Sequence, residues 1–450
     1  MVIRKRLIFW LIKAYFRRWK KTILICFGSG LFVFFVLRSV SPYFITRIFF
    51  SQKQIIGMVG VYHSDSLPLE ILGKISKGLT KIEEDGSVKP DIAEKWKISP
   101  NGRGYAFYLR KDIYFSDGKN LTSEDVNYNF TDVSVLRPDK HTIVFNLKDN
   151  YSPFLVTVSK PIFRNGLVGV GSHEVKKIKL NGNFVEFIEL YSESLGKTLV
   201  YELSYPTQDA LKTAFMLGEV SVATKLPDLK YKDEKIDTFE NVIVEKKVDK
   251  SKLVTLFYDT KDKTLSSKTL REALSYAIPD NFKQGERNID PIPYFSYANQ
   301  NVTRSQEDLE HAKLLIEKFK TETEIKNITL TIDVLVKYKD VAQVIADTWK
   351  KLNIKTKINL VDQIPTNFQI FLGEFNVSPD PDQYALWHSS QPNNIAHYSN
   401  LRIDKLLEDG RKELNIQKRI VIYADFQKYL LSDPPASFLF FPYYYEVTRK

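Results

Sequence analysis

The order of hydrophobic and polar positions after residue 54 predicts an α/β fold, because helical and strand patterns alternate along the chain. The expected strands are Ile55–Val61, two short strands in Tyr105–Phe115, Thr142–Leu147, Leu253–Tyr258, Ile328–Val336, Ile354–Leu360, Phe368–Leu372 and Phe438–Val447. The expected helices are a short one after Thr122, then Gln208–Leu217, Ser267–Ala277, Ser305 to about Lys320, Val341–Leu352, about 401–413 and about 416–431. The strand, helix and strand over 328–360 predict a βαβ unit with parallel strands.

The first 53 residues follow a different pattern. Sixteen uncharged residues run from Thr22 to Leu37, with eight basic residues before them and Arg38 directly after. A snorkelling arginine extends this run toward the ~20 residues that cross a bilayer, and the upstream positive charge places the N-terminus in the cytoplasm. We expect a basic cytoplasmic segment over 1–21, a transmembrane anchor over 22–40 and a linker over 41–54. A cleaved signal peptide is the alternative, although no small-x-small cleavage site follows the apolar run.

The net charge of +11 belongs to this segment. Residues 1–53 contain 11 Lys and Arg and no Asp or Glu, so the rest of the chain has 54 basic and 54 acidic residues. A nucleic-acid-binding surface requires a basic excess on the folded part, and the balance predicts none. The single cysteine, Cys26, excludes an intrachain disulfide and a cysteine zinc cluster.

An ordered series of turns and aromatic positions follows residue 78. It consists of Gly78-Leu79, Asp85-Gly86, Pro90 to Trp96, Asn101-Gly102, the alternating Tyr105, Phe107, Leu109 and Arg110, Phe115 with Asp117-Gly118, and Thr122 with Asp125-Val126. The series resembles the opening of family 5 extracellular solute-binding proteins, the oligopeptide- and dipeptide-binding group that serves ABC importers. Further similar stretches are Gly169–His173, Ala210–Val220, Tyr258–Thr260, Arg271–Ile278, Asp380–Asp382, Tyr398–Leu407 and the positions Arg419, Tyr423 and Gln427.

This resemblance implies an α/β, two-lobed, type II periplasmic-binding-protein fold whose lobes close on a ligand by a hinge motion. Lobe I is expected over 55–252, completed by 437–450, and lobe II over 253–436. Only eleven residues separate Phe130 from Thr142, where members of the family carry a long insert. The fold is therefore expected to have a reduced extra subdomain, and the N-terminal transmembrane helix precedes it.

Three strand ends are expected to meet at the ligand, because ligands of open α/β sheets sit beyond the carboxyl ends of strands. The candidate ligand-binding residues are Tyr62, His63, Ser64, Tyr258, Asp259, Asp380, Asp382, Trp387, His388 and Asn394. The alternative for the last group is structural: Asp380 and Asp382 cap a helix from about Gln383, and Trp387 is a core residue. Peptide-binding members of the family hold the ligand's ammonium with an aspartate at the position of Val377, so that interaction is in doubt unless Glu374 or Asp380 replaces it.

The favoured function is capture of peptides or similar small solutes for an ABC importer by a membrane-anchored, extracytoplasmic and monomeric protein. The expected partners are the solute, the importer's permease and the membrane, with no nucleic acid, metal or cofactor. The sequence contains no HExxH, Gly-x-Ser-x-Gly or Gly-x-x-x-x-Gly-Lys motif, so we expect no enzyme. One alternative is a surface sensor or assembly protein of the same fold that does not import, and a weaker one is an extracellular hydrolase.

Overall fold

The computed structural model describes residues 52–300, 307–323 and 325–450, together with single residues and short runs between 10 and 31. The expected cytoplasmic segment, anchor and linker therefore lie largely outside the described residues, as does Ser305, the expected start of a helix. Among the helices that are described, none combines the length and the apolar character needed to cross a bilayer.

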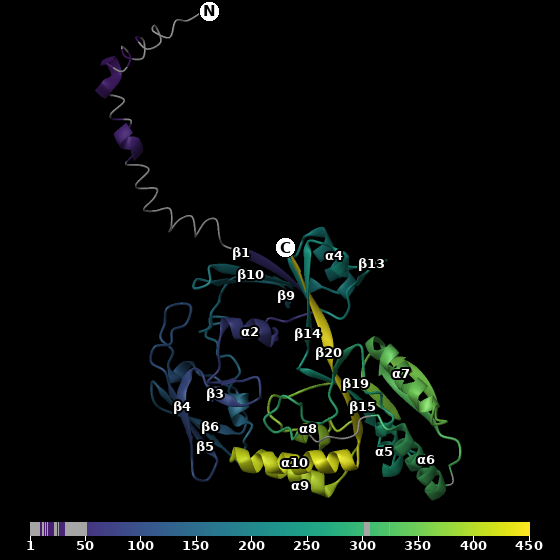
Figure 1. Cartoon of the computed structure of the whole chain (residues 1–450). Coiled ribbons are helices and arrows are strands. Elements are labelled where there is room, and N and C mark those ends of the chain that lie inside the picture. The colour runs from purple at the N-terminus through teal and green to yellow at the C-terminus, as the bar shows by residue number, and fades with distance from the viewer. Residues whose placement is uncertain are drawn as a thin grey trace, which may run out of the picture.

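Twelve strands of the described part form one hydrogen-bonded sheet that runs through two lobes (Figure 1). Lobe I contributes β1 (Gln52–Val59), β8 (Glu174–Asn181), β9 (Phe184–Ser192), β10 (Lys197–Tyr205), β11 (Val222–Leu226) and β14 (Val242–Val248). Lobe II contributes β15 (Lys252–Tyr258), β16 (Gly285–Arg287), β17 (Thr329–Leu335), β18 (Lys355–Val361) and β19 (Ile370–Asn376). The twelfth strand, β20 (Ala436–Arg449), belongs to both lobes.

Two chain crossings connect the lobes. The first is the short link between β14 and β15. The second lies inside β20, where residues up to Pro442 pair with β15 and β16 and residues from Tyr443 onward pair with β14. The strand thus continues through the lobe boundary expected at 436, and Phe438 to Phe441 lie in the cores of lobe II.

The helices of lobe II cover both faces of its sheet (Figure 1). Along β15, Val254, Leu256 and Tyr258 face one core, and Leu253 and Phe257 face the other. The first core packs against α5 (Lys268–Tyr276), α6 (Leu309–Thr323) and α7 (Lys339–Lys350), and the second against α8 (Tyr384–Trp387), α9 (Leu401–Lys412) and α10 (Ile416–Ser432). This alternation follows from the two-residue period of a strand.

Several sequence predictions are confirmed. The strands β17 and β18 are parallel neighbours joined by α7, as the βαβ pattern indicates. The helix α4 (Gln208–Leu217) begins after Thr207, whose side chain accepts a hydrogen bond from the amide of Ala210, and ends at Gly218 with φ +84°. Glycine suits that left-handed position because it has no Cβ. After Thr122, the expected helix is a 3₁₀ turn over Ser123–Asp125 that retains the capping box.

A smaller module lies below the sheet of lobe I and beside one end of α10 (Figure 1). Its sheet has the order β4 (Ala93–Ile98), β5 (Gly104–Leu109), β7 (Thr142–Leu147) and β6 (Val133–Asp139). Nearby lie α2 (Leu69–Ile75), α3 (Phe154–Thr157) and the hairpin of β2 (Thr80–Ile82) and β3 (Val88–Pro90), while β12 (Lys230–Tyr231) and β13 (Glu234–Lys235) form another hairpin in lobe I. Leu414, between α9 and α10, packs against the core of this module, so the module contacts lobe II as well as lobe I.

Candidate functional site

A pocket of about 650 Å³ opens on the face of lobe II that is turned toward lobe I. Its apolar wall includes Phe257, Phe375 and Leu386, and its charged residues are Lys252, Glu374, Asp380 and Asp382. Segments outside lobe II lie beside both ends of this pocket. At one end, a Cβ on Gly86 would overlap the carbonyl oxygen of Pro379. At the other end lies Tyr62, where burial and the charge of Glu70 raise the pKa of the hydroxyl and the nearby charge of Lys252 partly offsets the rise. All of the lining residues belong to lobe II, and the pocket opens toward lobe I and the small module.

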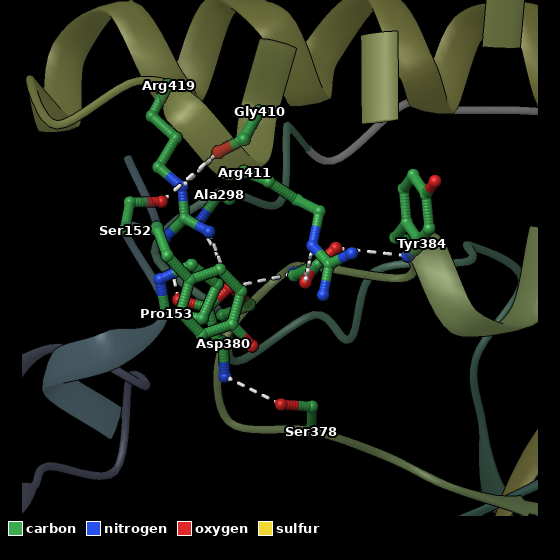
Figure 2. A network of polar contacts seen from close by, with 12 residues as sticks. Ser152, Pro153, Ala298, Ser378, Asp380, Tyr384, Gly410, Arg411 and Arg419 are labelled. Atoms are coloured by element: carbon green, nitrogen blue, oxygen red, sulfur yellow. Dashed lines mark hydrogen bonds and ion pairs between the residues drawn. The ribbon is translucent and has the colours of Figure 1, made fainter. Parts of the chain in front are cut away.

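The loop that forms one wall is held by a buried ion pair between Asp380 and Arg419 of α10 (Figure 2). Asp380 Oδ2 accepts a hydrogen bond from Arg419 Nη1 at 2.7 Å, and Oδ1 accepts one from Nη2 at 2.5 Å. Arg419 also donates to the carbonyl of Gly410 and to the hydroxyl of Tyr297. Such a bidentate pair fixes orientation as well as distance, so it positions the loop against the helix.

Asp382 forms a second pair with Arg411, the Nε atom of which lies 3.0 Å from Oδ2. Its Oδ1 accepts from the amide of Tyr384 at the start of α8. Burial raises the pKa of this carboxyl, and the charge of Arg411 opposes the rise. The backbone oxygen of Arg411 accepts a hydrogen bond from the amide of Ser152, which comes from the small module. The pair therefore lies where lobe II meets that module (Figure 2).

Glu374, on β19, is surrounded by donors. Lys252 Nζ lies 2.7 Å from one of its oxygens, and Lys337 Nζ and the Tyr338 hydroxyl bind the other at 2.8 Å and 2.5 Å. Burial disfavours the charged carboxylate, but the three donors outweigh it and lower the pKa of Glu374 to about 2. The carboxylate is thus ionised at neutral pH and already has its partners.

Two candidate residues are placed in the core instead of on the cleft wall. Tyr258 has no exposed surface, and its hydroxyl shares a hydrogen bond with Ser437. Trp387 is 1% exposed and packs near Phe257 and Phe438, while its indole nitrogen donates to Gln383. Neither side chain offers surface to a ligand in this structure. The surroundings of Trp387 agree with the alternative interpretation, in which it is a core residue, and not with the expected position at the cleft.

A second pocket of about 670 Å³ is also lined by residues of lobe II alone. Asn394 lines it and holds its loop by hydrogen bonds with the backbone of Tyr398. Asp259 Oδ1 lies 2.9 Å from Nδ1 of His397, another residue of its wall. His388 lines neither pocket and stacks on Tyr384 at 4.1 Å between ring centroids. Of the five candidates from the loop, only the two aspartates line the first pocket.

The candidates of lobe I lie in the loop after β1. The Tyr62 hydroxyl donates to the carbonyl of Val59, His63 packs on Phe184 at 4.6 Å between ring centroids, and Ser64 is exposed. Only Tyr62 is close enough to Lys252 for their charges to interact. The structure thus brings one of these three residues toward the first pocket.

Four residues at or behind this pocket were not among the sequence candidates: Lys252, Lys337, Arg411 and Arg419. Their partners lie far away in sequence, with 122 positions between Lys252 and Glu374 and 39 between Arg419 and Asp380. The sequence did indicate the importance of Arg419, since this residue matches a position of the family pattern. Within the residues that the structure describes, no group of three or more His, Cys, Asp or Glu side chains could hold a metal ion.

Comparison with known proteins identifies the family. The pattern of bacterial extracellular solute-binding proteins, family 5 Middle, matches residues 87–135 and 197–397. The oligopeptide-binding protein AppA of Bacillus subtilis is 23% identical over 457 residues, which cover 85% of this chain and 83% of AppA. The same protein's structure with a nonapeptide has a TM-score of 0.65 at 20% identity, covering 88% of this chain and 94% of that one.

A second solved structure is similar to the same extent. NikZ from Campylobacter jejuni, in complex with Ni(L-His), has a TM-score of 0.69 at 20% identity and covers 89% of this chain and 94% of that one. These likenesses confirm the two-lobed solute-binding fold that the motifs predicted. The match to the family pattern extends over more than half of the sequence, and the chain belongs to the bacterial extracellular solute-binding proteins of family 5.

Proposed function

We propose that this protein captures peptides or similar small solutes between its two lobes and delivers them to the permease of an ABC importer. The observation that carries the proposal is the pocket of about 650 Å³ on the face of lobe II that is turned toward lobe I. Its size lies within the range of small-molecule sites, and apolar walls with a few placed polar groups are typical of such sites. The relatives named as oligopeptide-binding and dipeptide-binding proteins support a peptide ligand.

Binding in this scheme requires a hinge and no bond-making chemistry, so we propose a binding protein and no enzyme. The two crossings, between β14 and β15 and inside β20 after Pro442, are the places where the lobes can rotate. Gly86 and Pro379 meet at the opposite rim. A solute in the pocket would lie between these crossings and this rim, and closure would remove it from water.

The membrane anchor over 22–40 remains part of the proposal. Its support is the sequence: an uncharged run, eight basic residues before it and no small-x-small site after it. A protein held in this way would stay beside the permease while its lobes work outside the cytoplasm. Cell fractionation with N-terminal sequencing tests the anchor. A membrane-bound chain that starts at Met1 supports it, and a released chain that starts near residues 40–55 contradicts it.

One observation favours the second candidate, a sensor or assembly protein that does not import. Val377 occupies the position at which peptide-binding members carry their ammonium-binding aspartate, and it packs against the core beside α8–α10. The usual contact with a free peptide amine is therefore absent at this position. A protein that signals occupancy would tolerate such a loss more readily than a general peptide scavenger.

Native mass spectrometry of the freshly purified full chain tests the capture of solutes. We expect extra masses in the range of small peptides, which disappear after unfolding and refolding. Ala385→Trp should remove these masses because Ala385 is exposed in the first pocket. Thr366→Trp places the same ring in the second pocket and should leave them in place. A chain that is always empty would contradict solute capture, and loss of the masses only in Thr366→Trp would contradict the choice of pocket.

A further inference from the structure

The carboxylates of the pocket between the lobes are covered and already paired. The side chains of Asp380, Asp382 and Glu374 are 6%, 10% and 14% exposed. Each faces at least one cation within 3.0 Å, and Asp380 Oδ1 also accepts from the amide of Asp382. An incoming ammonium would have to displace an arginine or a lysine from one of these groups. Glu374 and Asp380, the two residues considered as replacements for the missing aspartate, are therefore occupied.

The cations at the same pocket are much more accessible. The side chain of Lys252 is 39% exposed and lines the pocket, and that of Lys337 is 52% exposed. Both bind the one carboxylate of Glu374, so this cluster carries one positive charge in excess. Each arginine beneath the pocket faces one aspartate and adds no excess charge. The charge that a solute meets in this part of the pocket is that of a lysine ammonium.

Lobe I adds a second donor at the same end. The phenol of Tyr62 lies close enough to Lys252 for the charge of that lysine to act on it. Glu70 is an acidic group whose charge acts on Tyr62. Lys225 lies 3.5 Å from the carboxylate of Glu70, and the side chains of Lys225 and Glu70 are both about half exposed. A solute with an acidic group could thus contact Lys252 from lobe II and Tyr62 from lobe I once the lobes close.

We propose that the solute binds with a carboxylate at Lys252 and that the pocket does not select for a free ammonium. The inference rests on the proposed capture of peptides and adds the polarity of the bound molecule. It predicts a preference for acidic or N-blocked peptides over amidated ones. The preference should weaken as salt is added, because Lys252 is partly exposed and a charge there is screened.

Matched peptides separate the two polarities. Acetyl-Ala-Ala-Ala with a free carboxylate has no ammonium, and Ala-Ala-Ala-amide has an ammonium and no carboxylate. Isothermal titration calorimetry on the refolded full chain, at low salt, compares the two and the corresponding pairs from two to six residues. We expect the acetylated acid to bind at least tenfold more tightly. Lys252→Met should abolish this preference, and Lys252→Arg should keep most of it.

The control is Lys313→Met. Lys313 has a single glutamate partner, Glu310, on the outer face of α6, and its side chain is 51% exposed. The variant Lys313→Met should leave the affinities for the acetylated acid and for the amide unchanged. Tighter binding of the amides, or an undiminished preference in folded Lys252→Met, would overturn the inference and leave peptide capture intact. Equal affinity within each pair would do the same. Failure of every pair to bind would contradict peptide capture itself, and the inference with it.

Discussion

Replacing Asp380 by asparagine should destabilise lobe II strongly. The substitution keeps the shape of the side chain but removes the charge that faces Arg419, which is 5% exposed. One of the two short hydrogen bonds is lost, and an amide N–H₂ is placed against the guanidinium donors. Removing one partner of a buried pair leaves an uncompensated charge and typically costs about 3–5 kcal/mol. We expect a loss of that size in the free energy of unfolding.

Urea unfolding measures this loss. The fluorescence of Trp349 and Trp387, both buried in lobe II, reports that lobe even if the two lobes unfold separately. The control is Glu310→Gln, which makes the same chemical change at an exposed pair with Lys313 and should cost at most about 0.5 kcal/mol. The double variant Asp380→Leu with Arg419→Met should be more stable than Asp380→Asn, since neither charge remains buried. A loss below about 1 kcal/mol, or one no larger than the control's, would refute this reasoning.

Three further variants test other parts of the structure. Trp387→Ala should lower the free energy of unfolding by about 3–5 kcal/mol, as measured by urea, because the indole is a core group; a weaker affinity at unchanged stability would restore it to the site. Gly86→Ala should hold the lobes apart, since its Cβ would meet Pro379, and should raise the radius of gyration that X-ray scattering measures in the presence of solute. Gly118→Ala is the control, because this glycine has a similar φ of +80° but open space around it; equal scattering from the two variants argues against the rim contact. Glu374 has a pKa of about 2 against 4.5 in the unfolded chain, so its ionised form should stabilise the fold above pH 4.5, and this stabilisation should disappear between pH 4.5 and 2. In Glu374→Gln the free energy of unfolding should therefore depend less on pH over that window, and an unchanged slope in the variant counts against the cluster.

Local patterns predicted most strands of lobe II, but only β1 among the strands of lobe I. The helix Gln208–Leu217 and the βαβ unit over 328–360 follow from caps and hydrophobic period, and the structure confirms them. The antiparallel strands β8 and β9 were not predicted, because β8 is an edge strand with six of its eight residues exposed and lysines between its apolar positions. A strand that buries neither face has little alternation of apolar and polar residues by which to recognise it.

The site was harder to predict because it depends on distant pairings. The rule that ligands sit at strand ends named Asp380 and Asp382, which line the first pocket. It also named Tyr258, which the structure places in the core under α5–α7 with the other even positions of β15. Trp387 lies on a helix of four residues, too short for a pattern to reveal its buried face. The cation that pairs with each carboxylate lies far away in sequence, so residue spacing does not predict these ion pairs.

Hydrogen–deuterium exchange of the full chain, with and without the solute that it releases on unfolding, tests most directly whether a solute is held between the lobes. The account predicts slower exchange in the loop over 378–395 and in the facing turn over 83–87 at the same time, because the solute and the closed rim protect both. Protection of the 364–368 and 396–399 segments alone would place the solute in the second pocket. Protection confined to that pocket, or none at all, would contradict capture between the lobes.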